Sequence, residues 1–317
     1  MKYFITGGAG FIGSHLVDRL MNNHSVTVYD NLSLGKEIHL SHHSDKKNFK
    51  FVKADLLDFD TLKRTVAGHD AVFHLAANSD ISNNKVTDTD LKKGTLATYN
   101  VLEAMRLNNI KKIVFSSTSS IYGEAKIKPT PEDYGPLLPI SFYGASKLAC
   151  EGLISAFCHN FKMQAWILRF ANIAGDRGTH GVIVDLIRKL ERNNKELEIL
   201  GDGKQAKPYL YVKDCVDGML YGFHNSDDEV NYFNLSSDGS TKVKTIASIL
   251  VEEMGLKNVK FKFTGTMRGW PGDVPRVEMD TIKLSRLGWK CKLSSDESLR
   301  KAVRELLKGY NPQFSKA

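Results

Sequence analysis

Cysteine is scarce in this sequence of 317 residues, and the four present show neither a CxxC pair nor a recognisable metal-binding spacing. They are Cys150, Cys158, Cys215 and Cys291. Such isolated thiols are typical of a reducing compartment. We therefore expect reduced, mostly buried cysteines in a cytoplasmic protein that holds no metal.

Long hydrophobic runs are also missing. No apolar segment approaches the roughly 20 residues that a membrane-spanning helix needs. The chain opens with an expected strand at Lys2, without the charged and apolar regions of a signal peptide. We therefore expect no membrane partner.

Positive charge is present in excess but is not clustered. The 44 lysines and arginines outnumber the 36 acidic residues, which gives a net charge of +8. The basic residues are scattered or form short pairs such as Lys111-Lys112, whereas a nucleic-acid-binding face would concentrate them, so we expect no nucleic-acid partner. The segment with His39, His42 and His43 lacks a second group of ligands, which favours a solvent-exposed loop over a metal site.

The opening residues carry the strongest functional signal. The apolar run 3–5 predicts a buried strand, glycines follow at the spacing GxxGxxG, and a helix is expected over 11–22. Gly7 permits the tight turn, Gly10 lets the backbone approach a diphosphate, and Gly13 lets the helix pack on the sheet. The helix N-terminus then faces the phosphates.

Acidic residues end the next two expected strands. Asp30 lies about 20 residues beyond the glycines, where an acid accepts hydrogen bonds from the adenosine ribose. The polar turn 31–37 follows and would wrap the adenosine, and Asp55 would reach the adenine amino group. Since the Asp30 carboxylate would repel a 2′-phosphate, the sequence predicts NAD as cofactor in preference to NADP.

Strands and helices alternate as far as residue 172, which predicts an α/β fold with a doubly wound parallel Rossmann sheet. Beyond it the elements become shorter. We expect residues 1–172 to form the NAD-binding domain and residues 173–317 mainly a smaller α/β substrate domain, with the chain re-entering the first domain around 208–237. The expected helices of the first domain after the opening one span 61–67, 89–108 and 141–161.

The motif YGASK contains the candidate base. Tyr143 and Lys147 are four residues apart on the expected helix 141–161 and so share one face. A lysine ammonium one turn away should lower the tyrosine pKa from about 10 and let the phenolate take a hydroxyl proton. The same spacing recurs at Tyr122 in a loop and at Tyr209 on a strand, where the partners would not meet. Thr118 follows the fifth strand and can offer a hydroxyl to the same point.

In this order, the motifs make the sequence resemble extended short-chain dehydrogenases/reductases and, among them, the NAD-dependent epimerase/dehydratase family, especially nucleotide-sugar 4-epimerases of the UDP-glucose (UDP-galactose) type. The resemblance covers nearly the whole chain. The motifs that carry it are TGGAGFIGSHL, DNLSLGK, HLAA, FSSTSSIYG, YGASK, LRFANIAG and RGWPGDV.

The resemblance implies roles for individual residues, with Thr118, Tyr143 and Lys147 as the catalytic set. Two positions depart from the family pattern: Gly94 stands where asparagine is common, and Lys207 where arginine is usual. The implied NAD contacts are Gly7, Gly10, Phe11, Ile12, Gly13, Asp30, Asn31, Ser33, Gly35, Asp55, Leu56, Leu75, Ala76, Ala77, Ser116, Tyr143, Lys147 and Phe170. The implied substrate contacts are Thr118, Asn172, Leu200, Lys207, Arg268 and Asp273.

The implied activity is that of an isomerase, a 4-epimerase that acts on a UDP-hexose through a transient 4-keto sugar. Alternatives are a UDP-glucuronate or UDP-N-acetylhexosamine 4-epimerase, a nucleotide-sugar dehydratase or decarboxylase, and a non-catalytic dinucleotide sensor. Ser119 and Ser120 stand where related dehydratases carry Asp-Glu and decarboxylases carry a Glu at the second position, which favours epimerisation. The resemblance also implies a homodimer built through helices 89–108 and 141–161.

Overall fold

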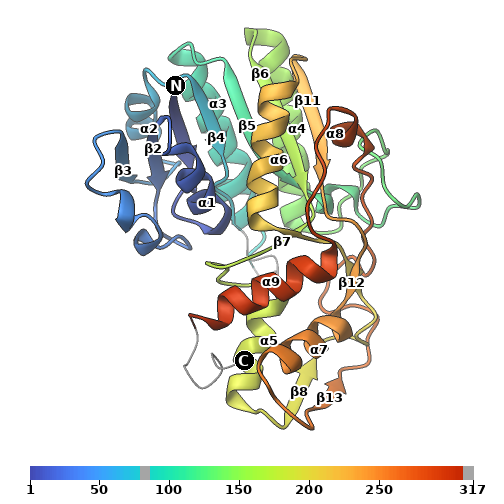
Figure 1. Cartoon of the computed structure of the whole chain (residues 1–317). Helices are drawn as coiled ribbons and strands as arrows, with labels where there is room; N and C mark the ends of the chain where they lie inside the picture. Colours follow the sequence, from blue (N-terminus) through green and yellow to red (C-terminus); the bar gives the residue numbers. More distant parts are fainter. Residues whose placement is uncertain (79–85, 310–317) are drawn as a thin grey trace.

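A large parallel sheet organises the molecule. The structure, a computed structural model, describes residues 1–78 and 86–309, and within them seven parallel strands run in the order β11-β6-β5-β4-β1-β2-β3 (Figure 1). This order, with strands added on both sides of β1, confirms the predicted doubly wound sheet. The strands are β1 (Lys2–Thr6), β2 (Ser25–Asp30), β3 (Phe49–Lys53), β4 (Ala71–His74), β5 (Lys112–Thr118), β6 (Gln164–Phe170) and β11 (Val230–Leu235).

Helices cover both faces of this sheet because its strands are apolar on both sides. Helices α1 (Phe11–Leu20) and α6 (Val212–Asn225) lie in front of it in Figure 1, where their apolar residues join one core with Tyr3 and Ile5 of β1. The opposite face takes Phe4 into a second core. That face is covered by α2 (Phe59–Val66), α3 (Ala97–Leu107) and α4 (Phe142–Phe161).

A smaller lobe lies below the carboxyl edge of the sheet in Figure 1. Its core contains apolar residues of α5 (Val182–Arg192), α7 (Val243–Glu253) and α9 (Ser295–Leu307). Ser294 starts α9 with a capping box in which its side chain and that of Glu297 each bond the other's backbone N–H. The short strand pairs are β7 (Asn172–Ala174) with β10 (Tyr209–Tyr211), β9 (Ala206–Lys207) with β12 (Thr241–Lys242), and β8 (Glu196–Ile199) with β13 (Lys260–Phe263).

The chain returns from the smaller lobe to the large sheet. Helix α6 packs on the sheet and β11 adds its edge strand, so residues 212–235 lie with the first 170 residues. Helix α8 (Ile282–Arg286) also packs on β11, and Trp289 joins the same core, a return that the sequence did not indicate. The domain limits 1–172 and 173–317 stay a prediction.

The expected helix 89–108 is not uniform. It contains a π-helical turn, η3 (Leu91–Leu96), before the α-helical α3 begins. The Ser146 hydroxyl of α4 donates to the Asp90 carbonyl at 2.7 Å, an acceptor that a regular α-helix would reserve for its own backbone. Gly94 lies so close that an added Cβ would be 2.2 Å from Ser146 Oγ, which explains glycine there.

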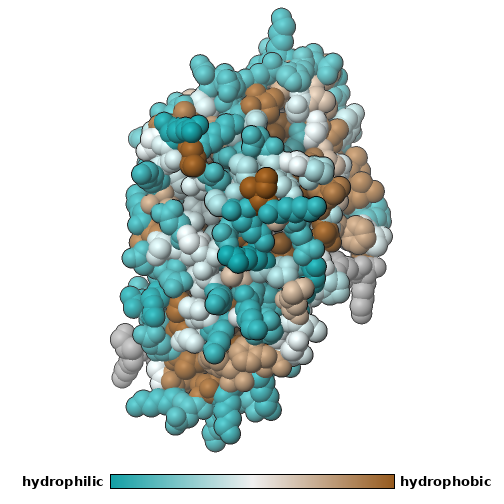
Figure 2. Space-filling view, turned by 90° about the vertical axis from the view of Figure 1, so that its right-hand side faces the viewer, coloured by the Kyte–Doolittle hydropathy of each residue, from teal (hydrophilic) through white to brown (hydrophobic). Residues whose placement is uncertain are grey.

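The surface composition and the burial of the cysteines are those of an ordinary globular protein. On the face shown in Figure 2, hydrophobic residues form small separate groups within mainly hydrophilic surroundings. None of the helices in the described ranges is both long and apolar enough to cross a bilayer. Cys150, Cys158 and Cys215 are buried free thiols and Cys291 is half-buried, as predicted.

Candidate active site

The glycine turn after β1 forms a close-packed cradle. Gly7 has a φ of +70°, and a Cβ there would lie 2.6 Å from the Ala76 backbone nitrogen. A Cβ on Gly13 would lie 2.1 Å from the Gly7 carbonyl oxygen. Helix α1 starts directly after Gly10, which has no side chain to cap it. The N-terminal N–H groups of α1 therefore face outward from a bare turn, as a diphosphate requires.

Asp30 and Asp55 are fixed beside this turn. Asp30 accepts hydrogen bonds from the backbone N–H groups of Ala9 at 3.0 Å and Leu32 at 2.8 Å. Burial raises the pKa of Asp30, although these two bonds oppose the change. Asp55 accepts from Asn31 Nδ2 at 2.8 Å, which joins the ends of β2 and β3.

Neighbouring segments complete the cradle. An added Cβ on Gly35 would meet Ala9 at 3.0 Å, so the loop with Ser33 packs against the glycine turn. The Leu75 and Ala76 N–H groups bond the backbone and side-chain oxygens of Thr6. The glycines, the bare helix end and the two fixed carboxylates fit the predicted NAD site, in which α1 would hold the phosphates and Asp30 and Asp55 the adenosine.

The catalytic candidates meet at the carboxyl edge, where β5 ends beside α4. Ser141 fixes the start of α4 by accepting the Gly144 N–H at 3.0 Å. One helical turn separates Tyr143 from Lys147, and Tyr143 lies beside Thr118. The Lys147 ammonium donates to the Ser116 carbonyl at 2.5 Å. Phe170, at the end of β6, is buried and pairs in register with Thr118.

The expectation that Lys147 lowers the pKa of Tyr143 is wrong for this arrangement. Burial raises the pKa of Tyr143 to about 12, and the Thr118 hydrogen bond offsets only part of that change. The Lys147 Nζ lies 5.9 Å from the tyrosine ring centroid and is directed to the Ser116 carbonyl instead. Burial also lowers the pKa of Lys147 to about 8. The phenol therefore keeps its proton near neutral pH in this state.

The two other YxxxK tyrosines have structural roles. Tyr122 donates to Asn234 Oδ1 at 2.8 Å and accepts from Arg169 at 2.9 Å, and burial raises its pKa to about 12. Tyr209 is buried on β10, where burial raises its pKa and Asn172 lies beside it. Of the three, Tyr143 stays the candidate for proton transfer.

Four of the six expected substrate residues lie together: Leu200 after β8, Lys207 of β9, and Arg268 and Asp273 of the segment 264–275. The other two lie elsewhere, Thr118 at the end of β5 and Asn172 at the start of β7. Lys207 Nζ lies 2.6 Å from Asp273 Oδ1, and Arg268 donates to the Asp273 carbonyl at 2.7 Å. Leu200 is half-exposed and lies beside Gly269. Arg268 also pairs with Glu124 at 2.8 Å, a contact that the sequence did not predict. The guanidinium and ammonium groups suit a diphosphate.

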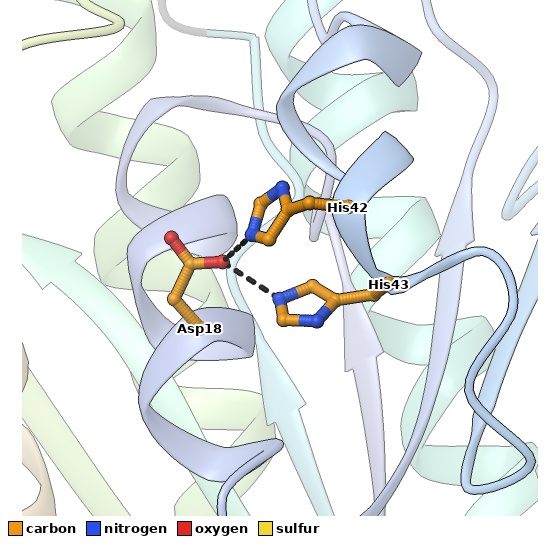
Figure 3. A group of neighbouring side chains, drawn as sticks. All are labelled: Asp18, His42 and His43. Atoms are coloured by element: carbon orange, nitrogen blue, oxygen red, sulfur yellow. Dashed lines mark hydrogen bonds and ion pairs between the residues drawn. The ribbon is translucent and has the colours of Figure 1, made fainter.

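The histidine segment is mostly exposed, as expected, but it forms two short 3-10 turns, η1 (Glu37–His39) and η2 (Ser41–His43), and buries His43. Figure 3 shows His42 and His43 directed at one oxygen of Asp18 from α1, at 2.7 and 2.8 Å. The Lys46 ammonium, which can only donate, lies 3.0 Å from His43 Nδ1. The proton of His43 therefore sits on the nitrogen that faces Asp18, where a metal ion would need a lone pair. Arg177 pairs with the second Asp18 oxygen at 2.8 Å.

Similar proteins extend this description. Residues 3–236 match the model of the NAD dependent epimerase/dehydratase family. A putative UDP-glucose 4-epimerase of Methanocaldococcus jannaschii is 33% identical, with 94% of this chain and 96% of that one covered. A crystal structure of UDP-galactose 4-epimerase has 35% identity and a TM-score of 0.88, covering 98% and 100%. The UDP-glucuronic acid 4-epimerase of Bacillus cereus, solved with UDP-glucuronic acid and NAD, has 29% identity and a TM-score of 0.88, covering 98% and 100%.

The family match extends over most of the chain and includes the glycine turn, both fixed carboxylates and the catalytic candidates. The M. jannaschii relative is matched along nearly its whole length. This chain belongs to the NAD dependent epimerase/dehydratase family.

Proposed function

We propose that the protein is an NAD-dependent 4-epimerase of a UDP-hexose, of the UDP-glucose/UDP-galactose type. The observation that carries the proposal is the meeting of Thr118, Tyr143 and Lys147 beside the glycine cradle, at the edge where β5 ends. The sugar named for similar proteins supports this class, since the M. jannaschii relative and the 35% identical structure are named for glucose and galactose.

The chain's own groups divide the work in this proposal. NAD, when bound, supplies a hydride acceptor and donor at the nicotinamide. Tyr143 removes the proton from the sugar O4 and later returns it. Thr118, which lies beside Tyr143, holds O4 and passes the proton. Burial lowers the pKa of Lys147 to about 8, so its charge persists at neutral pH. Lys147 would favour the phenolate once its ammonium, which is directed at the Ser116 carbonyl in this structure, turned toward Tyr143.

The side chains after Thr118 favour return of the hydride over loss of water or carbon dioxide. Ser120 is hydrogen-bonded to Thr118 through its N–H and its hydroxyl, each at 3.2 Å. A serine hydroxyl without a partner base is a poor proton acceptor near neutral pH. The Glu124 carboxylate, another candidate acid, is paired with Arg268.

Arg268 and Lys207 would bind the diphosphate of the substrate and Asp273 the uridine ribose. This assignment is supported by their mutual contacts in the smaller lobe. UDP-glucuronate is the second candidate substrate, because the B. cereus structure with that ligand covers nearly the whole chain.

We also propose a cytoplasmic homodimer. Helices α3 and α4 expose apolar side chains, among them Tyr99, Leu107, Phe142 and Phe161. Closed two-fold dimers commonly bury such faces. The unpaired cysteines suit a reducing compartment.

One assay tests the reaction class. The protein is incubated with UDP-glucose, UDP-N-acetylglucosamine and UDP-glucuronate in turn. The products are separated, and the mass of each is measured by mass spectrometry. We expect a 4-epimer of unchanged mass from UDP-glucose, and far less of it from the Tyr143→Phe variant in the same time. Loss of water or carbon dioxide, or no turnover of any of the three, would contradict the proposal.

A further inference from the structure

Three consecutive residues at the end of β5 face three residues on one stripe of α4. The Ser116 carbonyl accepts from Lys147 at 2.5 Å, the Ser117 hydroxyl donates to Glu151 Oε1 at 2.5 Å, and Thr118 lies beside Tyr143. The helical residues are each four apart, so they rise one above another along the helix. Glu151 is thus the third member of the stripe that carries the two catalytic candidates.

Glu151 is itself held by a buried partner. Arg169 of β6, the register partner of Ser117, donates from Nε to Glu151 Oε1 at 3.1 Å and from its terminal nitrogen to Oε2 at 2.8 Å. Glu151 and Arg169 are 7% and 6% exposed, so both charges are shielded from water. Such a two-pronged pair fixes orientation as well as distance.

Arg169 is also anchored from the other side. Its remaining terminal nitrogen donates to the Tyr122 hydroxyl at 2.9 Å and to the Glu132 carbonyl at 2.6 Å. Tyr122 in turn donates to Asn234 on β11. Burial alone would lower the pKa of Arg169, but the Glu151 carboxylate outweighs it and holds that pKa above its ordinary value. The guanidinium is therefore a permanently charged anchor between β6, α4 and the turn after β5.

We propose that Glu151, fixed by Arg169, is a positioning residue that sets the register of the catalytic helix α4 against the end of β5 through Ser117. The proposal rests on the epimerase function proposed above, because the groups so aligned are the base Tyr143 and its partner Thr118. Neither Glu151 nor Arg169 touches the reacting atoms in this role. A displacement of about 1 Å between base and substrate can cost about 100-fold in rate, which is why register matters.

Glu151 also acts on Lys147 through its charge. Its carboxylate raises the pKa of Lys147, against the larger lowering by burial. A Glu151→Gln variant keeps an oxygen for the Ser117 hydroxyl but loses the negative charge, so the Lys147 pKa should fall further below 8. The titratable groups that face Lys147 are Tyr143, Cys150 and Glu151 on α4, Asp90 ahead of η3, and His74 on β4.

Two variants distinguish the effect of the Ser117–Glu151 hydrogen bond from the effect of the negative charge on Glu151. Ser117→Ala removes the link between strand and helix and leaves the ion pair intact. We expect its kcat for epimerisation to fall about 10- to 100-fold with KM for the UDP-sugar changed by less than about twofold. Glu151→Gln keeps the bond to Ser117 and should instead move the basic limb of the pH–kcat profile to lower pH. Glu253→Gln, which removes a carboxylate from the distant Arg300 and Arg304 pairs, is the matched control and should change neither.

A second readout does not depend on activity. Amide hydrogen exchange of residues 113–118 and 143–151 should be faster in Ser117→Ala than in the wild type, while circular dichroism and UDP binding by calorimetry stay the same. Unchanged kcat and unchanged exchange in Ser117→Ala would overturn the positioning role, as would a kcat loss matched by an equal loss of folded protein. Absence of epimerisation by the wild type would instead refute the proposed function, and the exchange data would still decide whether Ser117 ties β5 to α4.

Discussion

Substituting Gly13 by alanine tests the glycine cradle directly. The added Cβ would lie 2.1 Å from the Gly7 carbonyl oxygen and 2.8 Å from Gly8 Cα, both backbone atoms that no rotamer change can move. Forcing extra atoms into a packed site costs about 1–3 kcal/mol. The glycine turn must open to make room, and we expect the free energy of unfolding to fall by about 3 kcal/mol, the upper end of this range.

The same displacement should weaken NAD binding. Moving one backbone N–H away from a phosphate forfeits a charge-assisted hydrogen bond worth about 1.5–3 kcal/mol. This loss corresponds to an affinity roughly 10- to 150-fold weaker, since every 1.4 kcal/mol is about tenfold. Calorimetric titration with NAD measures the affinity, and urea unfolding measures the stability.

Gly222→Ala is the matched control for this experiment. Gly222 is a buried glycine inside α6, and a Cβ there would be 3.5 Å from the Phe233 ring, an ordinary contact distance. Alanine in a helix interior is favoured over glycine by about 0.5–1 kcal/mol, so this variant should be slightly more stable and bind NAD normally. If Gly13→Ala behaved like Gly222→Ala in both measurements, the steric account of the cradle would be refuted.

Four further outcomes are expected. Tyr143→Phe should lose about 10²- to 10⁴-fold in kcat but keep its NAD affinity; near-wild-type turnover would remove the tyrosine from the mechanism. Glu124→Gln should strengthen UDP binding in calorimetry, because Arg268 loses a competing carboxylate; unchanged or weaker binding would contradict this. NAD should bind more tightly than NADP, with the preference reduced in Asp30→Asn. Burial lowers the pKa of His74 to about 3, so the unfolded chain binds a proton that the fold excludes, and the stability lost between about pH 7 and about pH 5 in urea unfolding should be about 2 kcal/mol smaller in His74→Asn than in the wild type.

Much of the cofactor cradle could be predicted from sequence because it depends on local order. A strand, spaced glycines, a helix and an acid at the end of the next strand are all separated by short stretches of chain, and Gly7 and Asp30 lie as this order requires. The choice of Tyr143 over Tyr122 and Tyr209 stays a prediction; the structure shows that Tyr143 and Lys147 are one turn apart on α4, whereas Tyr122 and Tyr209 are buried elsewhere.

Contacts between distant segments could not be predicted in this way. Glu124 and Arg268 are 144 residues apart, and the sequence gives no sign that they pair. Asp18 belongs to α1, and nothing in the sequence indicates that it contacts His42 and His43. The pKa direction of Tyr143 was wrong because burial and the direction of the lysine ammonium are three-dimensional quantities.

One missed feature did leave a signal in the sequence. Glu151 follows Lys147 by four residues, so the helical period that pairs Tyr143 with Lys147 also places Glu151 on that face. A charged residue on the sheet-facing side of a helix needs a buried partner. That reasoning identifies Glu151 as a bonded group, although only the fold shows that Arg169 and Ser117 are its partners.

The return of the chain to the large sheet has a consequence for synthesis on the ribosome. Strand β6 emerges early, but its outer neighbour β11 is not complete until residue 235, and the helix α6 that covers the front of the sheet comes just before it. Until then the nascent chain carries an unpaired strand edge and an uncovered apolar face, both of which favour aggregation. The N-terminal half must therefore wait for a segment of the C-terminal half before it can complete its core, and a nascent chain halted near residue 172 should depend on chaperones.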